Sequence, residues 1–520
     1  MNIWQVAREY AHLAEAGGVK NVVCSLCEGL AKLNHMVTLF IPLYGCTDLS
    51  TVSDFVIHKD FSINISVADK DFEICFATGK IGKISVVFVV SPCFTEKLGV
   101  YTYTAAEEEK NPQFVRGKGH IDAVEIEIMF QKAVVEYGKN AEIKPDVIHC
   151  HDATTALIPA LSNVPEKKEY LQSSKFIVTV HNAGPAYHHE IENIEKAHKL
   201  TSIPYDMLEL GLVGEVVEPY LLASNFGKIT TVSPWYAKEI TDPENNDTQG
   251  LSKAFYEKNV QVIGITNGID FEKYNPAYGE KSHLLFSYYP EKGDLEGKYK
   301  ARELFFNQFD ISSLSENKKL IEVDYTCISQ YGYLEALDDK TVIFSYHGRL
   351  VHQKGLEVIE KAIPLCIKQN PNIRFVITGQ GDVRLEEQQI KLANEFPGKV
   401  LYLKGYHRAL ARLCVAISDF IVLPSFFEPC GLEDFIASIV GTIPLAHKTG
   451  GLQKIVDKET GFLYSPNTHE ELCKNILSLV DFKNNEKSAF ISMIKNASNK
   501  VHFEYDWNNV IKNCYIPLYE

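Results

Sequence analysis

Hydrophobic and polar positions along the first ninety residues predict a strand, a loop, a helix and a second strand in turn. Residues 3–6 form a short apolar run, and the loop after them ends in Ala16-Gly17-Gly18. Residues 19–33 then place apolar side chains at the spacing of a helix with one buried face. The continuous apolar run MVTLFIP is typical of a strand buried on both faces. Strand, helix and strand in this order form a βαβ unit, so we expect a parallel sheet.

The same order of elements returns after residue 340. The segments TVIFSY, RFVITG, KVLYLKG, FIVLP and IPLAH predict strands, and stretches such as GLEVIEKAIPLCIK, RALARLCVAI and LEDFIASIV suit helices. The Asn-Gly pair in GITNGID marks a turn, and we place the boundary between the halves there, near residue 268. The pattern predicts an α/β protein of two doubly wound, Rossmann-like domains facing one another across a cleft. Ligands of such sheets bind outside the carboxyl ends of the strands.

Composition and charge narrow the class of partner. A chain of 520 residues with 45% hydrophobic and 23% charged residues can form two or more globular domains. The net charge of −15 argues against nucleic acid or an anionic membrane surface as the main partner. The N-terminus does not have the pattern of a signal peptide, and no apolar run approaches the roughly 18–20 residues that span a bilayer. We therefore expect a cytoplasmic protein.

Two motifs that suggest other functions are weak in this chain. Cys24-x-x-Cys27 has no second pair at zinc-finger spacing and falls on the apolar stripe of a predicted helix, so we interpret both thiols as core residues. The loop at Gly17 and Gly18 opens a helix, whose N-terminal N–H groups could face an anion; the alternative is a tight turn. It is not a G-x-G-x-x-G motif, which disfavours a dinucleotide oxidoreductase.

Polar side chains follow two predicted strands of the first half. His149, His151 and Asp152 stand at the end of one strand, and His181 and Asn182 directly follow another. Such positions at the edge of a parallel sheet suit catalysis, although a single strand-end histidine is as often structural. A zinc site at His149-x-His151 lacks further ligands at a recognisable spacing.

The second half of the chain places charged residues directly after predicted strands, as the first half does with His149, Asp152 and His181. Arg349 and Lys354 span the turn between a predicted strand and a helix that starts near Gly355. Fixed cations beside a helix N-terminus suit a diphosphate leaving group, whereas the alternative is two solvated surface cations. Glu428 lies in FEPCGL, just past the apolar run FIVLP, where packing does not require a carboxylate.

Taken together, these stretches resemble the glycogen synthase and starch synthase family of bacterial and plastid type, glycosyltransferase family 5. The resemblance covers nearly the whole chain, in the family's order. Its motifs are GGVKNVVCSLCEGLAKLNHMVTLFIPLYG, VIHCHDATTALIP, VTVHNAG, TTVSPWYAKEI, GITNGIDFEKYNP, RLVHQKGL, FEPCGLEDFIASIVGTIPLAHKTGGLQKIV, TGFLY and DWNNVIKNCYIPLY.

The resemblance implies the GT-B fold, with an N-terminal domain at 1–267 and a nucleotide-sugar domain at 268–500. Residues 501–520 would form a helix that returns to the first domain. It also implies retaining transfer of glucose from ADP-glucose, favoured over UDP-glucose, to the non-reducing end of an α-1,4-glucan. The acceptor and the nucleotide-sugar would be the partners, and neither a cofactor nor an essential metal is implied. The sequence indicates neither oligomeric state nor regulation.

The resemblance also assigns roles to residues. Arg349 and Lys354 would hold the donor diphosphate, Asp152 and His181 would line the reacting glucose, and Glu428 would contact the glucosyl unit. The glycine loops would border the phosphates, the backbone after Pro429 would bind sugar hydroxyls, and an exposed tyrosine would stack on the base. These substrate-binding positions are Gly17, Gly18, Asn267, Tyr406, Cys430, Gly431, Leu432, Thr449, Gly450 and Gly451.

Some positions depart from the family pattern. Glu15 stands where a lysine usually precedes the glycine pair, and we expect it to face away from the phosphates, with Lys20 supplying charge. Ala153 replaces an aromatic residue, and Glu433-Asp434 replaces Thr-Gln. Two alternatives remain: another retaining GT-B transferase with a different donor or acceptor, and an inactive paralogue that binds glycogen.

Overall fold

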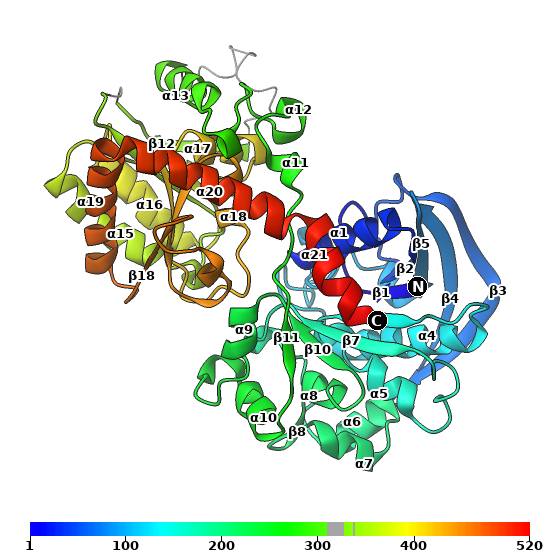
Figure 1. Cartoon of the computed structure of the whole chain (residues 1–520). Helices are drawn as coiled ribbons and strands as arrows, with labels where there is room; N and C mark the ends of the chain where they lie inside the picture. Colours follow the sequence, from blue (N-terminus) through cyan, green and yellow to red (C-terminus); the bar gives the residue numbers. More distant parts are fainter. Residues whose placement is uncertain (309–326, 336–337) are drawn as a thin grey trace. The chain divides into compact units, whose positions relative to one another are not determined.

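The computed structural model describes residues 1–308, 327–335 and 338–520, and they divide into two compact units (Figure 1). The first unit consists of residues 1–267 together with 510–520, and the second of residues 268–509. Helix α20 (Lys487–Tyr505) belongs to the second unit. The chain therefore re-enters the first unit at Val510, nine residues later than the start that we expected from the sequence.

The first unit is built on a nine-stranded sheet with the order β11-β10-β7-β6-β1-β2-β5-β4-β3. From β11 to β5 neighbouring strands run parallel, whereas β4 and β3 add an antiparallel hairpin at one edge. The strands are β1 (Asn2–Val6), β2 (Met36–Pro42), β3 (Ser53–Val67), β4 (Lys70–Ile81), β5 (Ile84–Val90), β6 (Val147–His151), β7 (Lys175–Val180), β10 (Lys228–Thr231) and β11 (Val262–Gly264).

Helix α1 (Val19–Lys32) confirms the apolar stripe that the sequence predicts. Val22, Val23, Leu26 and Leu30 are buried along one side of it. Cys24 and Cys27 are buried among them and form no disulfide, so their interpretation as core residues is confirmed.

The C-terminal segment packs against this unit. A Cβ added to Gly29 of α1 would meet Ile511 at 2.2 Å, so the glycine allows close contact with the returning chain. The segment runs through Ile511–Tyr515 to α22 (Ile516–Tyr519), and lysines bind its carbonyl oxygens: Lys228 binds Leu518 at 3.1 Å and Lys175 binds Tyr519 at 3.2 Å. A segment far along the sequence thereby completes the first unit.

The second unit has a seven-stranded sheet with the order β12-β15-β14-β13-β16-β17-β18. Its neighbouring strands are parallel except for β12, which is antiparallel to β15. The strands are β12 (Ser329–Gly332), β13 (Val342–His347), β14 (Ile373–Gly379), β15 (Val400–Lys404), β16 (Phe420–Leu423), β17 (Ile443–His447) and β18 (Phe462–Tyr464).

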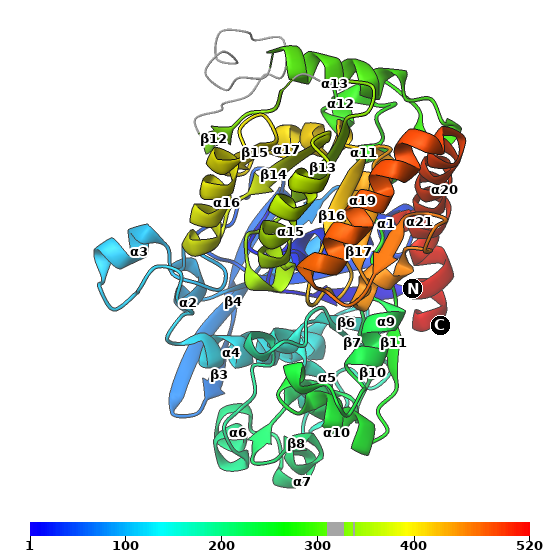
Figure 2. The same cartoon turned by 90° about the vertical axis from the view of Figure 1, so that its left-hand side faces the viewer.

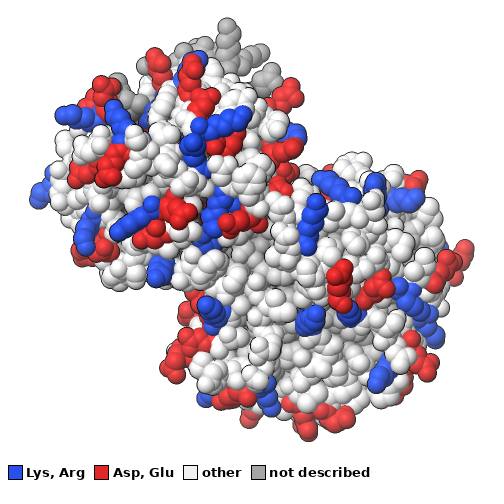
Figure 3. Space-filling model, viewed as in Figure 1, with Lys and Arg blue, Asp and Glu red and all other residues white. Residues whose placement is uncertain are grey.

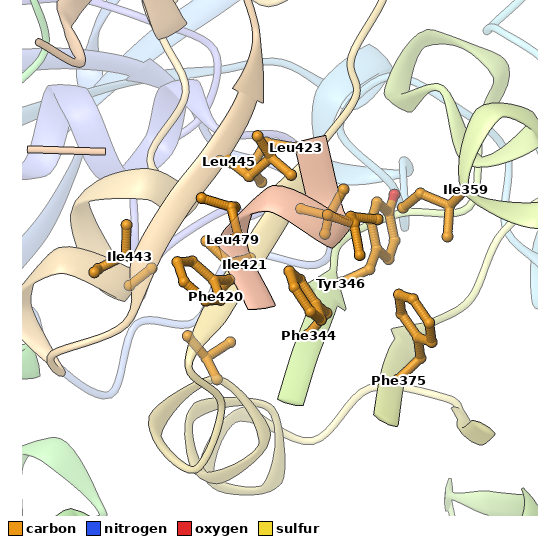
Figure 4. Close-up of a cluster of buried hydrophobic side chains, with 14 of the residues drawn as sticks. Phe344, Tyr346, Ile359, Phe375, Phe420, Ile421, Leu423, Ile443, Leu445 and Leu479 are labelled. Atoms are coloured by element: carbon orange, nitrogen blue, oxygen red, sulfur yellow. The ribbon is translucent and has the colours of Figure 1, made fainter. Parts of the chain in front are cut away.

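Helices cover both faces of this sheet. Successive side chains of a strand point to opposite faces, so both faces carry apolar side chains that helices can bury. Phe344 packs with Phe375, Phe420 and the helices α15 (Leu356–Gln369), α16 (Val383–Glu395) and α19 (His469–Asn485), as Figures 2 and 4 show. Its neighbour Ile343 packs on the other side, against α17 (Arg408–Ala416). The expectation of two doubly wound α/β domains is confirmed for each unit.

Each sheet reverses its strand order at one point. In the first unit the strands β2 to β5 lie on one side of β1, and the later strands, from β6 on, lie on its other side. In the second unit the chain proceeds outward in one direction from β13 and in the other from β16. Such a switch point leaves a crevice at the carboxyl ends of the two strands, where ligands of open parallel sheets bind. The fold therefore indicates where to look for a site in each unit.

The charges on the surface and the character of the helices agree with the expectations from composition. Basic and acidic side chains are interspersed over the face seen in Figure 3. Within the described residues, no helix has both the length and the apolar character that crossing a membrane requires.

Candidate active site

Asp152 lies at the switch point of the first unit, directly after β6. Its backbone has φ 64° and ψ 174°, a conformation that costs a non-glycine residue about 1–3 kcal/mol. This geometry directs Oδ1 to the backbone N–H of His181, which donates to it at 2.9 Å, and near the hydroxyl of Tyr220 at 3.5 Å. A strained backbone held by hydrogen bonds at a strand end is typical of a functional residue.

The environment of Asp152 also alters its protonation. Burial raises the pKa of its carboxyl group to about 6, although the hydrogen bond from His181 N opposes the shift. A carboxylate that is poorly hydrated interacts more strongly with a cationic partner than a solvated one does. Asp152 therefore suits contact with a sugar that develops positive charge.

His181 follows β7 and lies beside His151. Its Nε2 is 3.0 Å from His151 Nδ1, and the imidazole rings of His149 and His151 stack 4.4 Å apart on the same face of β6. Burial lowers the pKa of His149 and His181 to about 3, so both rings are neutral at physiological pH. His149 is fully buried, whereas His181 keeps 9% of its surface exposed. Of the histidines proposed from the sequence, His181 is the one placed to touch a ligand.

The glycine loop is held in place by a buried carboxylate. Glu9 accepts hydrogen bonds from Ala16 N at 3.1 Å and Gly17 N at 2.5 Å. The N–H of Gly17 is thus already bound by an internal anion, and that the N–H groups at the helix start face a ligand stays a prediction. Gly18 remains open, since a Cβ added there would meet nothing within 4 Å.

Glu15, the unusual residue before the glycine pair, is half exposed and ion-paired. Its Oε2 lies 2.7 Å from Lys20 Nζ, and its Oε1 accepts a hydrogen bond from His12 N at 2.8 Å. The ammonium group of Lys20 offsets the negative charge of Glu15. That Glu15 faces away from a bound diphosphate stays a prediction.

In the second unit, Lys354 and Glu428 come together at the switch point. Lys354 stands after β13 and Glu428 after β16, and their Nζ and Oε2 atoms are 2.5 Å apart. Ser425 Oγ donates a second hydrogen bond to the same carboxylate oxygen at 3.0 Å. Arg349 is exposed, and its guanidinium makes no ion pair with any residue that the structure describes. The pair places one cation and one anion side by side, with a second cation nearby in the sequence.

The loop after Glu428 is held close to the loop at Gly451. A Cβ on Gly451 would meet the carbonyl oxygen of Cys430 at 2.2 Å, and Gly451 N donates to the carbonyl of Glu428 at 2.8 Å. Gly431 has φ 77°, which favours glycine. The small residues therefore allow two backbone segments to approach each other where the family resemblance implies contacts to sugar hydroxyls.

A buried lysine organises this loop. Lys454 Nζ donates to the carbonyls of Cys430 at 2.6 Å, Gly431 at 3.0 Å and Gly451 at 3.1 Å, and it lies 3.0 Å from Asp434 Oδ1. Both charged residues are less than 5% exposed. Asp434, which departs from the family pattern, is therefore the ion-pair partner of Lys454 beneath the loop.

The remaining predicted positions are spread over the two units. Tyr406 is 55% exposed at the end of β15, and its ring lies 6.4 Å from that of His347 beside a small pocket. Thr449 Oγ1 donates to the carbonyl of Phe426 at 3.2 Å. Asn267 is buried at the end of the first unit, and its Oδ1 has no hydrogen-bond partner among the described residues.

Two histidine groups bear on metal binding. Both ring nitrogens of His149 hydrogen-bond within the protein, to Tyr519 at 2.8 Å and Thr179 at 2.6 Å. His188 Nδ1 lies 2.8 Å from Glu218, near Glu190, and its Nε2 faces the carbonyl of Ala183 at 2.8 Å. Burial opposes protonation of His188, but the carboxylate raises its pKa, so an imidazolium paired with Glu218 accounts for the group.

Sequence reasoning missed residues whose importance depends on distant partners. Gln5 is a polar residue within the apolar run NIWQV, and that contrast is a signal that could have identified it. Glu9 and Lys454 gave no comparable signal, because Glu9 acts on a loop eight residues away and Lys454 on a loop 23 residues away.

Comparisons with known proteins give the class of protein. The model of the starch synthase catalytic domain matches residues 2–256, and that of group 1 glycosyl transferases matches residues 335–499. The fold is similar to the catalytic domain of Arabidopsis thaliana starch synthase IV bound to ADP and acarbose, with TM-score 0.77, 24% identity and coverage of 100% of this chain and 98% of that one. The two doubly wound units and these matches define a glycosyltransferase of the GT-B fold.

Curated relatives identify the family. The glycogen synthase of Thermodesulfovibrio yellowstonii is 30% identical over all of this chain and 97% of its own length. The probable starch synthase 4 of Arabidopsis thaliana is 29% identical over 87% of this chain and 40% of its own length. The chain belongs to the family of glycogen and starch synthases.

Proposed function

We propose that this protein transfers glucose from ADP-glucose to the non-reducing end of an α-1,4-glucan, with retention of configuration. Membership of the glycogen and starch synthase family supports the glucan acceptor. The ADP bound to starch synthase IV from Arabidopsis thaliana supports the nucleotide. The observation that carries the proposal is the contact between Lys354 and Glu428 at a sheet switch point, which offers opposite charges to the two products of bond cleavage.

The chemistry explains why both charges are needed. Breaking the bond between the sugar and the diphosphate leaves positive character on the glucosyl ring and negative charge on the leaving group. Lys354 and Arg349 stabilise the diphosphate, and Glu428 holds the glucosyl unit. Because Lys354 and Glu428 pair with each other in this structure, donor binding exchanges that ion pair for one between Lys354 and the diphosphate. Glu428 then faces the glucosyl ring, where positive character develops as the bond breaks.

The other candidate residues also divide between contacts to the sugar and contacts to the nucleotide. In the first unit, Asp152 and His181 contact the reacting glucose. In the second, the backbone from Cys430 to Leu432 binds sugar hydroxyls, Thr449 and the two glycines after it border the phosphates, and Tyr406 stacks on the base. Two protein cations serve the leaving group, so we propose transfer without a metal or other cofactor.

Nucleotide release in the presence of glycogen tests the proposal. We expect turnover with ADP-glucose to exceed turnover with UDP-glucose, and a chelator such as EDTA to leave the rate unchanged. Higher turnover with UDP-glucose would overturn the donor assignment alone. Absence of turnover with either donor, in protein shown to be folded, would contradict the proposed activity and favour a glucan-binding paralogue.

A further inference from the structure

A chain of buried hydrogen bonds joins His181 to Tyr519 in the C-terminal segment. It passes from His181 Nε2 to His151 Nδ1 at 3.0 Å, from His151 Nε2 to Gln5 Oε1 at 2.8 Å, and from Gln5 Nε2 to the Tyr519 hydroxyl at 3.2 Å. All of these contacts lie within the first unit. With the exception of His181, whose surface is 9% exposed, its members are at most 2% exposed, so the network is shielded from water.

The network continues on the far side of Tyr519. Its hydroxyl lies 2.8 Å from His149 Nδ1, His149 Nε2 lies 2.6 Å from Thr179 Oγ1, and Thr179 Oγ1 lies 2.7 Å from Thr230 Oγ1. These side chains occupy neighbouring strands on one face of the sheet, which the C-terminal segment covers. A buried polar network of this kind is stable only where every donor meets an acceptor.

Gln5 sets the direction of the donors, because its amide has one accepting and one donating end. The amide oxygen faces His151, so His151 donates from Nε2 and accepts at Nδ1. The proton between the two imidazoles therefore belongs to His181 Nε2. Since burial keeps His181 neutral, its single ring proton is used there, and Nδ1 is left as an acceptor.

The same direction satisfies the other half of the network. Gln5 Nε2 donates to Tyr519, whose own proton goes to His149 Nδ1. His149 then donates from Nε2 to Thr179, and Thr179 to Thr230. Reversing the Gln5 amide would reverse every bond and move the proton of His181 from Nε2 to Nδ1.

We propose that Gln5 and Tyr519 are positioning residues that fix the ring tautomer of His181, so that its Nδ1 accepts a hydrogen bond from a hydroxyl of the bound sugar. Among the residues that the structure describes, none hydrogen-bonds Nδ1, and His181 retains an exposed edge. The assignment rests on the proposed function, because it takes the ligand of this atom to be the glucosyl unit.

Replacing Tyr519 by phenylalanine tests the proposal. Tyr519→Phe removes the hydroxyl that holds the Gln5 amide, and we expect kcat with glycogen and ADP-glucose to fall about tenfold while the donor KM stays within about twofold. Lys175→Met is the matched control: it loosens the same C-terminal residues, because Lys175 binds the carbonyl of Tyr519, yet it leaves the network intact. Unchanged kcat in Tyr519→Phe, or an equal loss in Lys175→Met, would overturn the proposal.

Donors with fluorine in place of single hydroxyls give a second readout, since fluorine cannot donate. At one sugar position, fluorine should reduce turnover of the wild-type enzyme about tenfold. It should reduce turnover of Tyr519→Phe far less, because that variant has already lost the hydrogen bond between the sugar hydroxyl and His181 Nδ1. An equal reduction in both proteins at every position would refute the assignment.

NMR of protein with ¹⁵N-labelled histidine rings reads the tautomer without turnover, with His181→Asn used to assign the signals. We expect a protonated Nε2 and a bare Nδ1 in the wild type, and a mixture of tautomers in Tyr519→Phe and Gln5→Met. A wild-type proton on Nδ1 would overturn the proposal even if transfer is observed. Absence of transfer with the expected tautomer would instead contradict the proposed function.

Discussion

At the scale of single residues, Asp152 combines two unfavourable features. Its backbone has a positive φ, and burial raises its carboxyl pKa from 3.8 to about 6. Because the folded protein binds the proton more tightly than the unfolded chain, ionisation destabilises the fold as pH rises from about 4 to 6. Above about pH 6, the fold carries the full free-energy cost of an ionised Asp152 carboxylate.

Asp152→Asn should therefore stabilise the protein at pH 7, by about 1–3 kcal/mol in the free energy of unfolding, since one pKa unit corresponds to about 1.4 kcal/mol. The gain should shrink as pH falls from about 6 to 4 and vanish below about pH 3, where the carboxyl group is protonated in both states. Urea denaturation of both proteins between pH 4 and 7.5 measures it. Turnover should be lost in the variant, and a pH-independent stability difference would contradict the pKa.

Lys354 carries the charge on which the proposed transfer depends most directly. Lys354→Ala would remove a cation from the proposed leaving-group site, and we expect kcat to fall by about 10²-fold or more. Lys361→Ala, an exposed lysine on helix α15, is the control and should retain wild-type kcat. Steady-state release of nucleotide measures both, and equal rates for the two variants would exclude a role for Lys354 in transfer.

Residues at strand ends could be predicted from the sequence, whereas their supports could not. Asp152, His181 and Glu428 each follow an apolar strand, so a local pattern reveals them. The partner of Gln5 lies 514 positions away, and the partner of Glu9 is a backbone N–H. Neither contact leaves a local signal, because it depends on how distant segments pack.

At the scale of elements, the close approach of the loops at Cys430 and Gly451 admits no side chain. Gly451→Ala would place a Cβ 2.2 Å from a backbone oxygen, so the two segments must separate. We expect a loss of about 1–3 kcal/mol in stability and a higher donor KM. Gly119→Ala, where a Cβ meets nothing within 4 Å, is the control. Thermal unfolding and donor titration test both, and an unchanged KM in Gly451→Ala would contradict the role of this loop.

Lys454 stabilises the same loop from below. Lys454→Met leaves Asp434 buried without its partner, which typically costs about 3–5 kcal/mol. The double variant Lys454→Met/Asp434→Leu removes both charges and should recover much of that stability without restoring donor affinity, because the three carbonyls remain unbound. Denaturant titration of the three proteins checks the coupling. Additive losses would show that the ion pair does not stabilise the loop.

Parallel strands and their helices could be predicted because each carries its own hydrophobic period. β13 and α15 follow the sequence pattern closely, as does the βαβ unit at the N-terminus. The order of strands in a sheet is set by long-range pairing, which periodicity does not contain. The switch points at β1 and β6 and at β13 and β16 therefore became visible only in the structure.

At the scale of the whole molecule, the first unit is discontinuous in sequence while the second is continuous. Residues 510–520 cover the polar row of the first sheet, where Gln5, His149 and Thr179 lie. Without Tyr519, two of these groups would lose a buried hydrogen-bond partner, at about 1–3 kcal/mol each. The first unit therefore depends on the end of the chain for its stability.

Ending the chain at residue 509 should lower the unfolding temperature of the first unit and leave that of residues 268–509 unchanged. The physical reason is local: Ile511 no longer packs at Gly29, and the polar row opens to water. Hydrogen exchange read by mass spectrometry separates the units, and β6 and β7 should lose protection while β13 and β14 keep theirs. Addition of a peptide of residues 510–520 should restore part of the protection. Equal loss in both sheets would show that the C-terminal segment stabilises the molecule as one cooperative unit instead.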